Sequence, residues 1–241
     1  MAEALILGAG SDMAVAIARR LADRKYNLVL AGRDQELLSD LKADLQIRSG
    51  ITVRTVFFDA LDYASHPAFY AGLQPDVTVC AFGYLGDQDK GMTDWEEAQR
   101  ILATNFTGAV SILNVVAADY LSRGHGMIVG ISSVAGDRGR GSNYLYGSAK
   151  AGFSAYLSGL RNRAAKKGVT VLTVKPGFAA TRMTAHLNLP PALTASPEQV
   201  AAAVIRGMDG RKNTVYVKSL WKWLMLIIRL IPENVFKKMN L

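Results

Sequence analysis

Short apolar runs alternate with longer amphipathic stretches along almost the whole chain, and this alternation limits the fold more than any other feature. The apolar runs cover residues 4–7, 27–31, 51–57, 76–81, 126–131 and 169–174. Stretches with helical spacing lie between them, such as residues 34–48, whose leucines form one apolar face. Strands that alternate with helices of these lengths pair in parallel through right-handed crossovers. The sequence therefore predicts a doubly wound α/β fold with a parallel sheet of about seven strands.

The chain is long enough for one large hydrophobic core. It has 241 residues, half of them hydrophobic, and no linker, repeat or low-complexity segment interrupts it. We expect a single domain over residues 1–217, followed by an amphipathic helical extension over residues 218–241 that is both hydrophobic and basic.

Cysteine content and the first residues indicate the compartment. The single cysteine, Cys80, excludes an internal disulfide and suits a reducing environment. The chain begins MAEALILGAG, with an acidic residue where a secretory signal would be basic. This beginning predicts a strand rather than a signal peptide, and we expect a cytoplasmic protein.

Most of the net charge of +8 lies at the C-terminal end. From Arg206 onward, eight Lys or Arg residues stand against two acidic residues, so six of the eight net positive charges lie in the last 36 residues. No nucleic-acid-binding motif accompanies this basic end, and its neighbours are apolar. We therefore expect an anionic membrane surface, and no nucleic acid, as a partner of this segment.

The first apolar run ends in a glycine-containing turn that leads directly into a helix. Gly8, Gly10 and Ser11 form the turn, and Asp12 and Met13 follow at the helix start. Free backbone N–H groups and the helix dipole make such a helix N-terminus an anion site, so we predict that it binds the phosphates of a dinucleotide. A carboxylate at Asp12 is unfavourable there unless it caps the helix and points away. An ordinary strand-to-helix turn is the alternative.

The second apolar run ends at Gly32, Arg33 and Asp34. In dinucleotide-binding folds an acidic residue at this strand end binds the ribose hydroxyls, whereas an Arg accommodates the 2′-phosphate of NADP. Gly32 takes the place of the acid, and Arg33 follows it. The sequence thus favours NADP(H) over NAD(H), with a surface Arg before a helix as the alternative.

Tyr146 and Lys150 lie four residues apart in a stretch rich in Ala and Leu, so both side chains project from one face of the predicted helix. A nearby ammonium group stabilises a phenolate and makes the tyrosine a better acid or base at neutral pH. Ser133 adds a hydroxyl that can hold a substrate oxygen. Because Tyr and Lys at this spacing are common on helices, the pair alone does not predict catalysis.

The full arrangement resembles the short-chain dehydrogenase/reductase family. A strand reading GMIVGIS precedes Ser133, Tyr146 follows Ser133 by thirteen positions, and Tyr146 begins a Tyr-x-x-x-Lys motif. The resemblance implies a Rossmann fold in which Tyr146 is the general acid and Ser133 polarises the carbonyl. Lys150 would lower the pKa of Tyr146 and bind the nicotinamide ribose. Asn105 matches the residue that holds the water of the family's proton relay, and a satisfied Asn inside a helix is the alternative.

The same resemblance extends the cofactor site to other strand ends. Asp59 and Ala60 match a pair that contacts adenine, and Cys80 to Gly83, which include the cofactor candidates Ala81 and Gly83, lie where the family usually has Asn-Asn-Ala-Gly. Leu7 and Ala81 replace two polar residues that tie neighbouring strands together in the family, so their joint loss leaves no polar group unpaired. A segment resembling the family's Pro-Gly…Thr stretch beside the nicotinamide adds Pro176, Gly177 and Thr181. We expect no metal site.

Residues 219–231, SLWKWLMLIIRLI, are the most hydrophobic stretch. As a helix they span about 20 Å, too short to cross a hydrocarbon core of about 30 Å. Lys218, Lys222 and Arg229 fall on one side of this helix, and apolar residues cover much of the rest. The pattern predicts a helix lying in a membrane interface. A subunit interface and a lid over the substrate pocket fit equally well.

Four segments narrow the substrate by resemblance. FDALDYASHP (58–67), AFGYLGD (81–87), TRMTAHL (181–187) and IPENVFKKM (231–239) resemble short-chain reductases that act on a polyprenyl-phosphate-linked 2-keto-pentose. The resemblance implies NADPH-dependent reduction of such a hydrophobic, lipid-linked ketone, which would explain the basic and apolar C-terminus. Arg138, Arg140 and Arg182 are then candidates for binding the substrate phosphate.

Two other functions stay open at this point. A short-chain reductase of another hydrophobic carbonyl, such as a 3-oxoacyl or sterol-like compound, fits the same residues. A cofactor-binding subunit without catalysis fits the irregular glycine turn, but such a subunit need not keep all four residues of the predicted catalytic set. The family resemblance also implies a homodimer or homotetramer formed through the helices near 104–122 and 144–166. An oxidase partner that makes the keto substrate is a further expectation.

Overall fold

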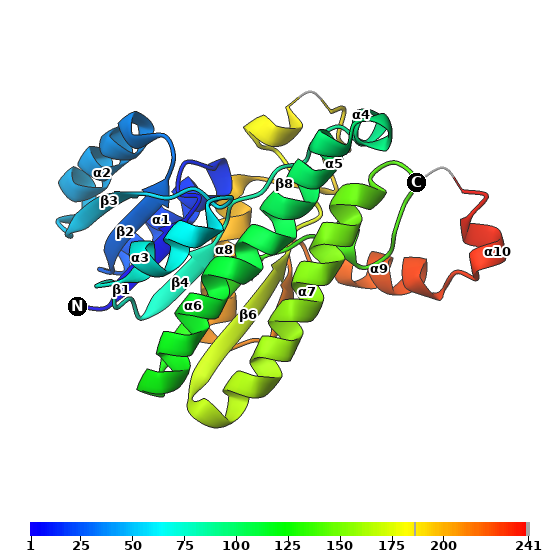
Figure 1. The fold of residues 1–241 in the computed structure, drawn as a ribbon. Coiled ribbons are helices and arrows are strands. Elements are labelled where there is room, and N and C mark those ends of the chain that lie inside the picture. Colours follow the sequence, from blue (N-terminus) through cyan, green and yellow to red (C-terminus); the bar gives the residue numbers. More distant parts are fainter. Residues whose placement is uncertain (186, 240–241) are drawn as a thin grey trace.

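A seven-stranded parallel sheet forms the centre of the protein. The fold comes from a computed structural model, which describes residues 1–185 and 187–239 (Figure 1). The strand order is β3-β2-β1-β4-β5-β6-β9. The bounds are β1 (Glu3–Leu7), β2 (Asn27–Gly32), β3 (Val53–Phe57), β4 (Val77–Cys80), β5 (Gly126–Ile131), β6 (Val169–Lys175) and β9 (Thr214–Tyr216), with a separate short pair of β7 (Phe178–Ala179) and β8 (Thr194–Ala195). The predicted doubly wound sheet is confirmed.

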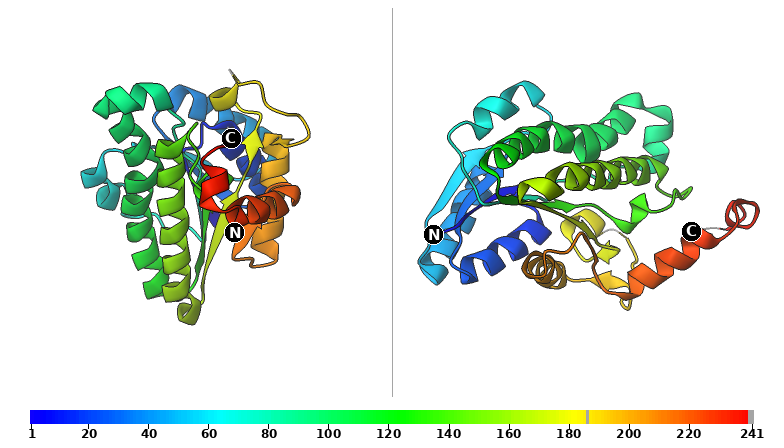
Figure 2. Two further views of the ribbon diagram at one scale, coloured as in Figure 1. Left: turned by 90° about the vertical axis from the view of Figure 1, so that its right-hand side faces the viewer. Right: turned by 90° about the horizontal axis from the view of Figure 1, so that it is seen from below.

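Helices cover both faces of this sheet, as the view from below shows (Figure 2). One layer holds α1 (Asp12–Asp23), α2 (Gln35–Ser49) and α8 (Pro197–Asp209), with α1 packed between the other two. The opposite layer holds α3 (His66–Tyr70), α6 (Gly108–Arg123) and α7 (Tyr144–Ala164), with α4 (Gln88–Thr93) and α5 (Trp95–Leu102) above them. Because both faces are covered, the strands are apolar throughout rather than alternating.

The central strand β1 shows how the two cores form. Successive side chains of a strand point to opposite faces. Ala4 and Ile6 accordingly join the core beneath α1 and α8, whereas Leu5 and Leu7 join the core beneath α6 and α7. The backbone N–H of Ala81 donates to the carbonyl of Leu7 over 2.9 Å. The two apolar replacements expected at Leu7 and Ala81 therefore lie together, and a backbone hydrogen bond joins the two residues.

The carboxyl ends of the strands meet at one edge, and the loops that follow them build the site. Polar side chains start the helices that leave these loops: Ser11 accepts a hydrogen bond from the N–H of Ala14 (3.3 Å), and Asp34 accepts one from Leu37 (3.0 Å). The chain reverses its winding direction between β1 and β4, which is where doubly wound folds bind ligands.

The helical region from Trp95 to Arg123 is interrupted. A turn of π-helix at Ala103–Thr107 separates α5 from α6. Asn105 explains the interruption, because its side-chain amide takes the carbonyl of Ile101 (2.8 Å) that a regular helix would use. The combined stretch Trp95–Arg123 is long and apolar enough by composition to cross a membrane, but here it packs against α7 and the rest of its layer.

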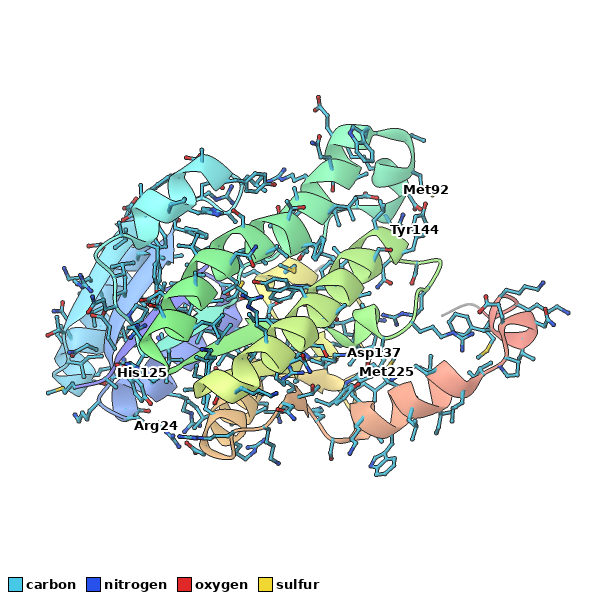
Figure 3. The ribbon with its side chains drawn as sticks, turned by 60° about the horizontal axis from the view of Figure 1, so that its bottom comes forward. Arg24, Met92, His125, Asp137, Tyr144 and Met225 are labelled. Atoms are coloured by element: carbon cyan, nitrogen blue, oxygen red, sulfur yellow. The ribbon has the colours of Figure 1, made fainter. Side chains whose placement is uncertain are left out.

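Two helices end the described chain, α9 (Leu220–Leu230) and α10 (Glu233–Phe236). The helix predicted over 219–231 is thus found, although Lys218 precedes it with a left-handed backbone (φ 57°). Trp221 and Met225 are the buried residues of α9 and pack with Val134, which lies in the loop after β5. Figure 3 labels Met225 on α9 beside Asp137 of that loop.

Candidate active site

Two cavities open along the carboxyl edge of the sheet. The first, of about 400 Å³, is lined by the loops after β1, β2, β3 and β4. The second, of about 250 Å³, is lined by the start of α1, the loop after β4, the end of β5 and residues of α7. Ser11, Phe82, Gly83 and Arg182 line both cavities, so the two meet at the glycine turn.

Close packing requires a glycine at the first position of this turn. Gly8 has φ +78°, and a Cβ there would lie 2.6 Å from the Cβ of Phe82. Ser11 then caps α1. Gly8, Gly10 and Ser11 line the first cavity, and Ser11, Asp12 and Met13 line the second, so the predicted phosphate-binding residues stand at the junction.

Asp12 is paired rather than capping the helix. Its carboxylate accepts hydrogen bonds from the backbone N–H of Arg182 (2.7 Å) and from Nε of the same residue (2.8 Å). The Arg182 guanidinium also donates to the carbonyl of Gly10 (2.5 Å). The pair resolves the problem of a carboxylate in an anion site, because Arg182 neutralises it. Sequence reasoning missed the pair, since 170 positions separate the two residues.

The outer end of the first cavity carries the residues predicted for adenosine. Arg33 is exposed at its rim, and Asp59 and Ala60 line it. Beneath them lies a buried histidine that the sequence analysis did not single out: His66 donates from Nε2 to the Asp59 carbonyl (3.1 Å), and its Nδ1 hydrogen-bonds the Ser111 hydroxyl (2.8 Å). His66 therefore holds the backbone at Asp59, at the end of the cavity predicted for adenosine. In the sequence, only the presence of a His in the segment after Asp59 could have indicated this role.

Tyr146 and Lys150 lie at the second cavity, whereas Ser133 is buried next to Tyr146 and its neighbour Ser132 lines the cavity. Tyr146 and Lys150 line it from the first turns of α7, and the Lys150 Nζ lies 5.6 Å from the centre of the Tyr146 ring. Ser133 follows β5, accepts a hydrogen bond from the N–H of Ala135 (3.1 Å) and hydrogen-bonds Tyr146. The predicted catalytic group is thus assembled by one strand end and one helix.

The acidities of this group differ from the expectation. Burial raises the pKa of Tyr146 to about 12, and the hydrogen bond with Ser133 only partly opposes this shift. The expected lowering of this pKa by Lys150 is not what the structure shows, because the ammonium donates to the carbonyl of Ile131 (3.1 Å) instead. Burial also lowers the pKa of Lys150 to about 8. At neutral pH, Tyr146 is therefore protonated and can donate a proton.

Asn105 holds the loop after β4 in place. Its side chain donates to the carbonyl of Tyr84 (2.5 Å) and accepts from the N–H of the same residue (3.2 Å). Gly83 lies between Asn105 and the active lysine: a Cβ at Gly83 would stand 2.9 Å from Asn105 Oδ1 and 3.6 Å from Lys150 Nζ. Asn105 is thus next to the catalytic group, and its role in a proton relay stays a prediction.

In the segment after β6, some predicted site residues line the second cavity and others contact neighbouring loops. Thr181 lines the second cavity, as predicted for a cofactor contact. Pro176 and Gly177 are not among the described lining residues of either cavity. The Pro176 carbonyl accepts from the N–H of Val134 (2.9 Å), and a Cβ at Gly177 would lie 2.0 Å from the Trp221 ring. These two residues contact neighbouring loops, and their predicted contact with the cofactor stays a prediction.

The three arginines proposed for a substrate phosphate have different surroundings. Arg138 donates to the carbonyls of Ile228 (2.5 Å) and Ile231 (2.6 Å) and pairs with Glu233, so it caps α9 and is not free for a phosphate. Arg182 is held by Asp12. The buried Nε of Arg140 has no hydrogen-bond partner within residues 1–185 and 187–239. Arg140 is therefore the candidate that the structure leaves available.

Comparisons with known proteins agree with this geometry. Residues 2–191 match the family model described as short chain dehydrogenase. An uncharacterized oxidoreductase of Mycobacterium tuberculosis is 38% identical over 243 residues, which cover 99% of this chain and 97% of the relative. Ketoacyl reductase HetN of a Nostoc species is 26% identical, over 96% of this chain and 85% of its own length. A short-chain dehydrogenase from Sphingobium yanoikuyae, solved in complex with NADPH, superposes with a TM-score of 0.83 at 23% identity and covers 99% of this chain and 96% of its own. Since the family model matches most of its length, the chain belongs to the short-chain dehydrogenase family of oxidoreductases.

Proposed function

We propose that the protein is an NADPH-dependent ketoreductase, which interconverts a ketone and a secondary alcohol, and that its substrate is a polyprenyl-phosphate-linked 2-keto-pentose. The observation that carries the proposal is that Tyr146 and Lys150 line a cavity that meets a cleft of dinucleotide size, with Ser133 beside Tyr146.

The residues of the first cavity fit NADPH. The glycine turn and the start of α1 suit the pyrophosphate, and Arg33 at the rim suits a 2′-phosphate. The Sphingobium dehydrogenase of the same fold was solved with NADPH, which supports the choice of cofactor. When bound, NADPH would supply the hydride for the carbonyl carbon.

The chain's own residues supply the rest of the chemistry. Reduction of a ketone also needs a proton at the oxygen, and Tyr146 holds one at neutral pH because burial raises its pKa to about 12. Ser133 already hydrogen-bonds the Tyr146 hydroxyl, so it can hold the carbonyl oxygen at the same place. The products would be the alcohol and NADP⁺, and Tyr146 regains its proton from solvent, so the balance is ketone, NADPH and one proton consumed.

Two features support a large substrate with a phosphate. Arg140 lies between Ser133 and Tyr146 in the sequence, and its buried, unpaired Nε favours an anionic ligand. A third cavity, of about 560 Å³, shares Asp12, Thr181 and Arg182 with the second and continues along residues 180–185 and 187–194. Ala185, Leu187 and Leu189 are among its lining residues, which suits the apolar part of a lipid.

The test is turnover of the lipid-linked ketone. Purified protein with NADPH should reduce polyprenyl-phosphoryl 2-keto-pentose, and Tyr146→Phe should lose turnover while it still binds NADPH. Arg140→Ala should raise KM for this substrate and leave KM for a phosphate-free ketone unchanged. Turnover of the phosphate-free ketone alone would refute the substrate, and the absence of NADPH binding would refute the reductase itself.

A second candidate is the reduction of another hydrophobic carbonyl, such as a 3-oxoacyl or sterol-like compound. The similarity to ketoacyl reductase HetN favours the 3-oxoacyl group. A kcat/KM for a 3-oxoacyl thioester above that for the lipid-linked ketosugar would select it. A cofactor-binding subunit without catalysis would instead show NADPH binding and no turnover of either.

The location and assembly follow from the same proposal. We place the enzyme in the cytoplasm, at the cytoplasmic face of the membrane that would hold its lipid-linked substrate. An oxidase partner would generate the 2-keto group from the corresponding alcohol. A homodimer or homotetramer through α6 and α7, which lie side by side on one face of the sheet, is the assembly that analytical ultracentrifugation should detect.

A further inference from the structure

The two C-terminal helices leave an apolar surface uncovered. We call it the α9–α10 surface and define it by its exposed apolar residues, Leu220, Trp223, Leu226, Ile227, Leu230, Val235 and Met239. Trp223, Ile227 and Leu230 repeat at spacings of four and three, so they form one stripe along α9. Trp223 is 59% exposed and Leu230 is 73% exposed. The stripe lies opposite Trp221 and Met225, which are buried against the body of the protein.

Basic side chains lie beside this stripe. Lys222 and Arg229 are exposed on α9, and Lys237 and Lys238 are exposed directly after α10. Glu233 is the one acidic residue between positions 218 and 239, and Arg138 pairs with it (2.9 Å). The α9–α10 surface is therefore apolar at its centre and positively charged at its edges. This combination is complementary to an anionic lipid surface, whose headgroups lie above an apolar layer.

The shape of the segment fits a surface contact. The 11 residues of α9 span about 16 Å, about half of a hydrocarbon core, so α9 cannot cross a bilayer. Figure 2 shows α9 and α10 extending beyond the edge of the sheet, away from the helical layers. A symmetric contact with a second copy is less favourable, because it would bring the basic edges of two identical surfaces together.

We propose that the α9–α10 surface lies on an anionic membrane, with Trp223, Ile227 and Leu230 inserted between the headgroups and the basic residues paired with lipid phosphates. The helix that makes this contact also supports the active-site loops: Trp221 donates from Nε1 to the carbonyl of Leu193 (2.9 Å) and packs edge-on against Phe178. The use of this contact for presenting a lipid-linked substrate rests on the proposed function, but membrane binding itself does not.

The experiment is flotation of the full chain with lipid vesicles. Vesicles of phosphatidylcholine alone are compared with vesicles that also contain phosphatidylglycerol, at low and high salt. We expect binding to the anionic vesicles that weakens with salt. The double variant Trp223→Glu, Leu230→Glu should bind at least about tenfold more weakly, because two inserted apolar side chains become anionic. Tryptophan emission should shift to shorter wavelength on binding in the wild type.

The chain offers a matched control on the opposite helical layer. Met92 of α4 and Trp95 of α5 are 64% and 68% exposed, so Met92→Glu, Trp95→Glu makes the same chemical change elsewhere and should leave vesicle binding unaltered. A second pair, Lys237→Gln with Lys238→Gln, tests the charge without touching an apolar contact. It should weaken binding to the anionic vesicles by about tenfold or more, at about 1 kcal/mol for each basic residue. Circular dichroism checks the fold of each variant.

Three results would overturn the inference. The wild type could stay with the soluble fraction at low salt, or the Met92 and Trp95 control could lose binding as much as the Trp223 and Leu230 variant. The third is a change of mass in analytical ultracentrifugation without vesicles on substituting Trp223 and Leu230, which would assign the surface to a contact between copies. NADPH turnover of a water-soluble ketone, measured without vesicles, separates these failures from a failure of the proposed function.

Discussion

Replacing Lys150 with Met should stabilise the protein at neutral pH while it abolishes catalysis. Lys150 is buried (4% exposed), and its pKa falls from the ordinary 10.5 to about 8. A lysine whose pKa is lower in the folded state than in the unfolded state opposes folding wherever both states are protonated. At 1.36 kcal/mol per pH unit, the interval between these pKa values corresponds to roughly 3 kcal/mol at pH 7. Losing the hydrogen bond to the Ile131 carbonyl costs about 1 kcal/mol. The free energy of unfolding of Lys150→Met should therefore be about 2 kcal/mol higher than that of the wild type.

The dependence on pH identifies the cause. Below pH 8 the stability difference between Lys150→Met and the wild type should be constant. Between pH 8 and 10.5 the folded wild type has lost its proton and the unfolded chain has not, so wild-type stability rises with pH and the difference shrinks. Burial raises the pKa of Cys80 to about 12, so its thiol stays neutral in both folded proteins, and the ionisation of the unfolded thiol is common to both and leaves their difference unchanged.

Urea denaturation at pH 7 and pH 10 measures both differences, with Lys166→Met at an exposed position as the control. A gain at pH 7 that persists unchanged at pH 10 would mean that packing, and not the buried charge, explains it. A variant less stable than the wild type at pH 7 would refute the reasoning altogether.

Three further predictions concern cofactor binding and the C-terminal helices. Arg33→Ala should weaken binding of NADPH at least about tenfold and leave NADH unchanged, as charge-assisted phosphate contacts contribute about 1.5–3 kcal/mol; fluorescence titration measures this selectivity. Arg182→Ala should weaken NADPH and NADH by similar factors, because it leaves the Asp12 carboxylate unpaired beside the phosphate turn, and adding Asp12→Asn should restore part of the loss; an effect on NADPH alone would contradict this. Arg138→Ala should expose α9 and α10 to limited proteolysis and leave residues 1–217 protected, with Arg206→Ala, on exposed surface of α8, as the control.

The sequence predicts the strands well, because their apolar character is local. Each of the six apolar runs is a strand of the sheet, and Ser133, Tyr146 and Lys150 meet because a strand end and a helix start are fixed neighbours in this fold. The interruption at Ala103–Thr107 was not predicted, since it depends on a side chain that competes with the helix backbone. The seventh strand, β9, is three residues long and carries too little pattern to be placed from sequence.

Charges were harder to interpret than apolar patterns. Arg138, Arg140 and Arg182 look equivalent in the sequence, yet two of them are taken up by partners about 90 and 170 positions away. The expected lowering of the Tyr146 pKa was wrong for a similar reason. Spacing on a helix predicts that the Lys150 ammonium is near Tyr146. It does not predict that the ammonium donates to the Ile131 carbonyl or that burial raises the pKa of Tyr146. Sequence patterns indicate which residues can lie close together. The partner that each polar side chain binds depends on groups that are distant in the sequence.

The cap that Arg138 places on α9 has a consequence for the order of folding. A helix end usually relies on its own neighbours or on water, whereas the carbonyls of Ile228 and Ile231 depend on the Arg138 side chain, 90 and 93 positions earlier. Contacts this distant in sequence close late, because the intervening chain must first be ordered. The most adhesive segment of the protein therefore takes its shape only after β5 and its following loop exist, which shortens the time during which a sticky, half-formed helix is present beside an incomplete core.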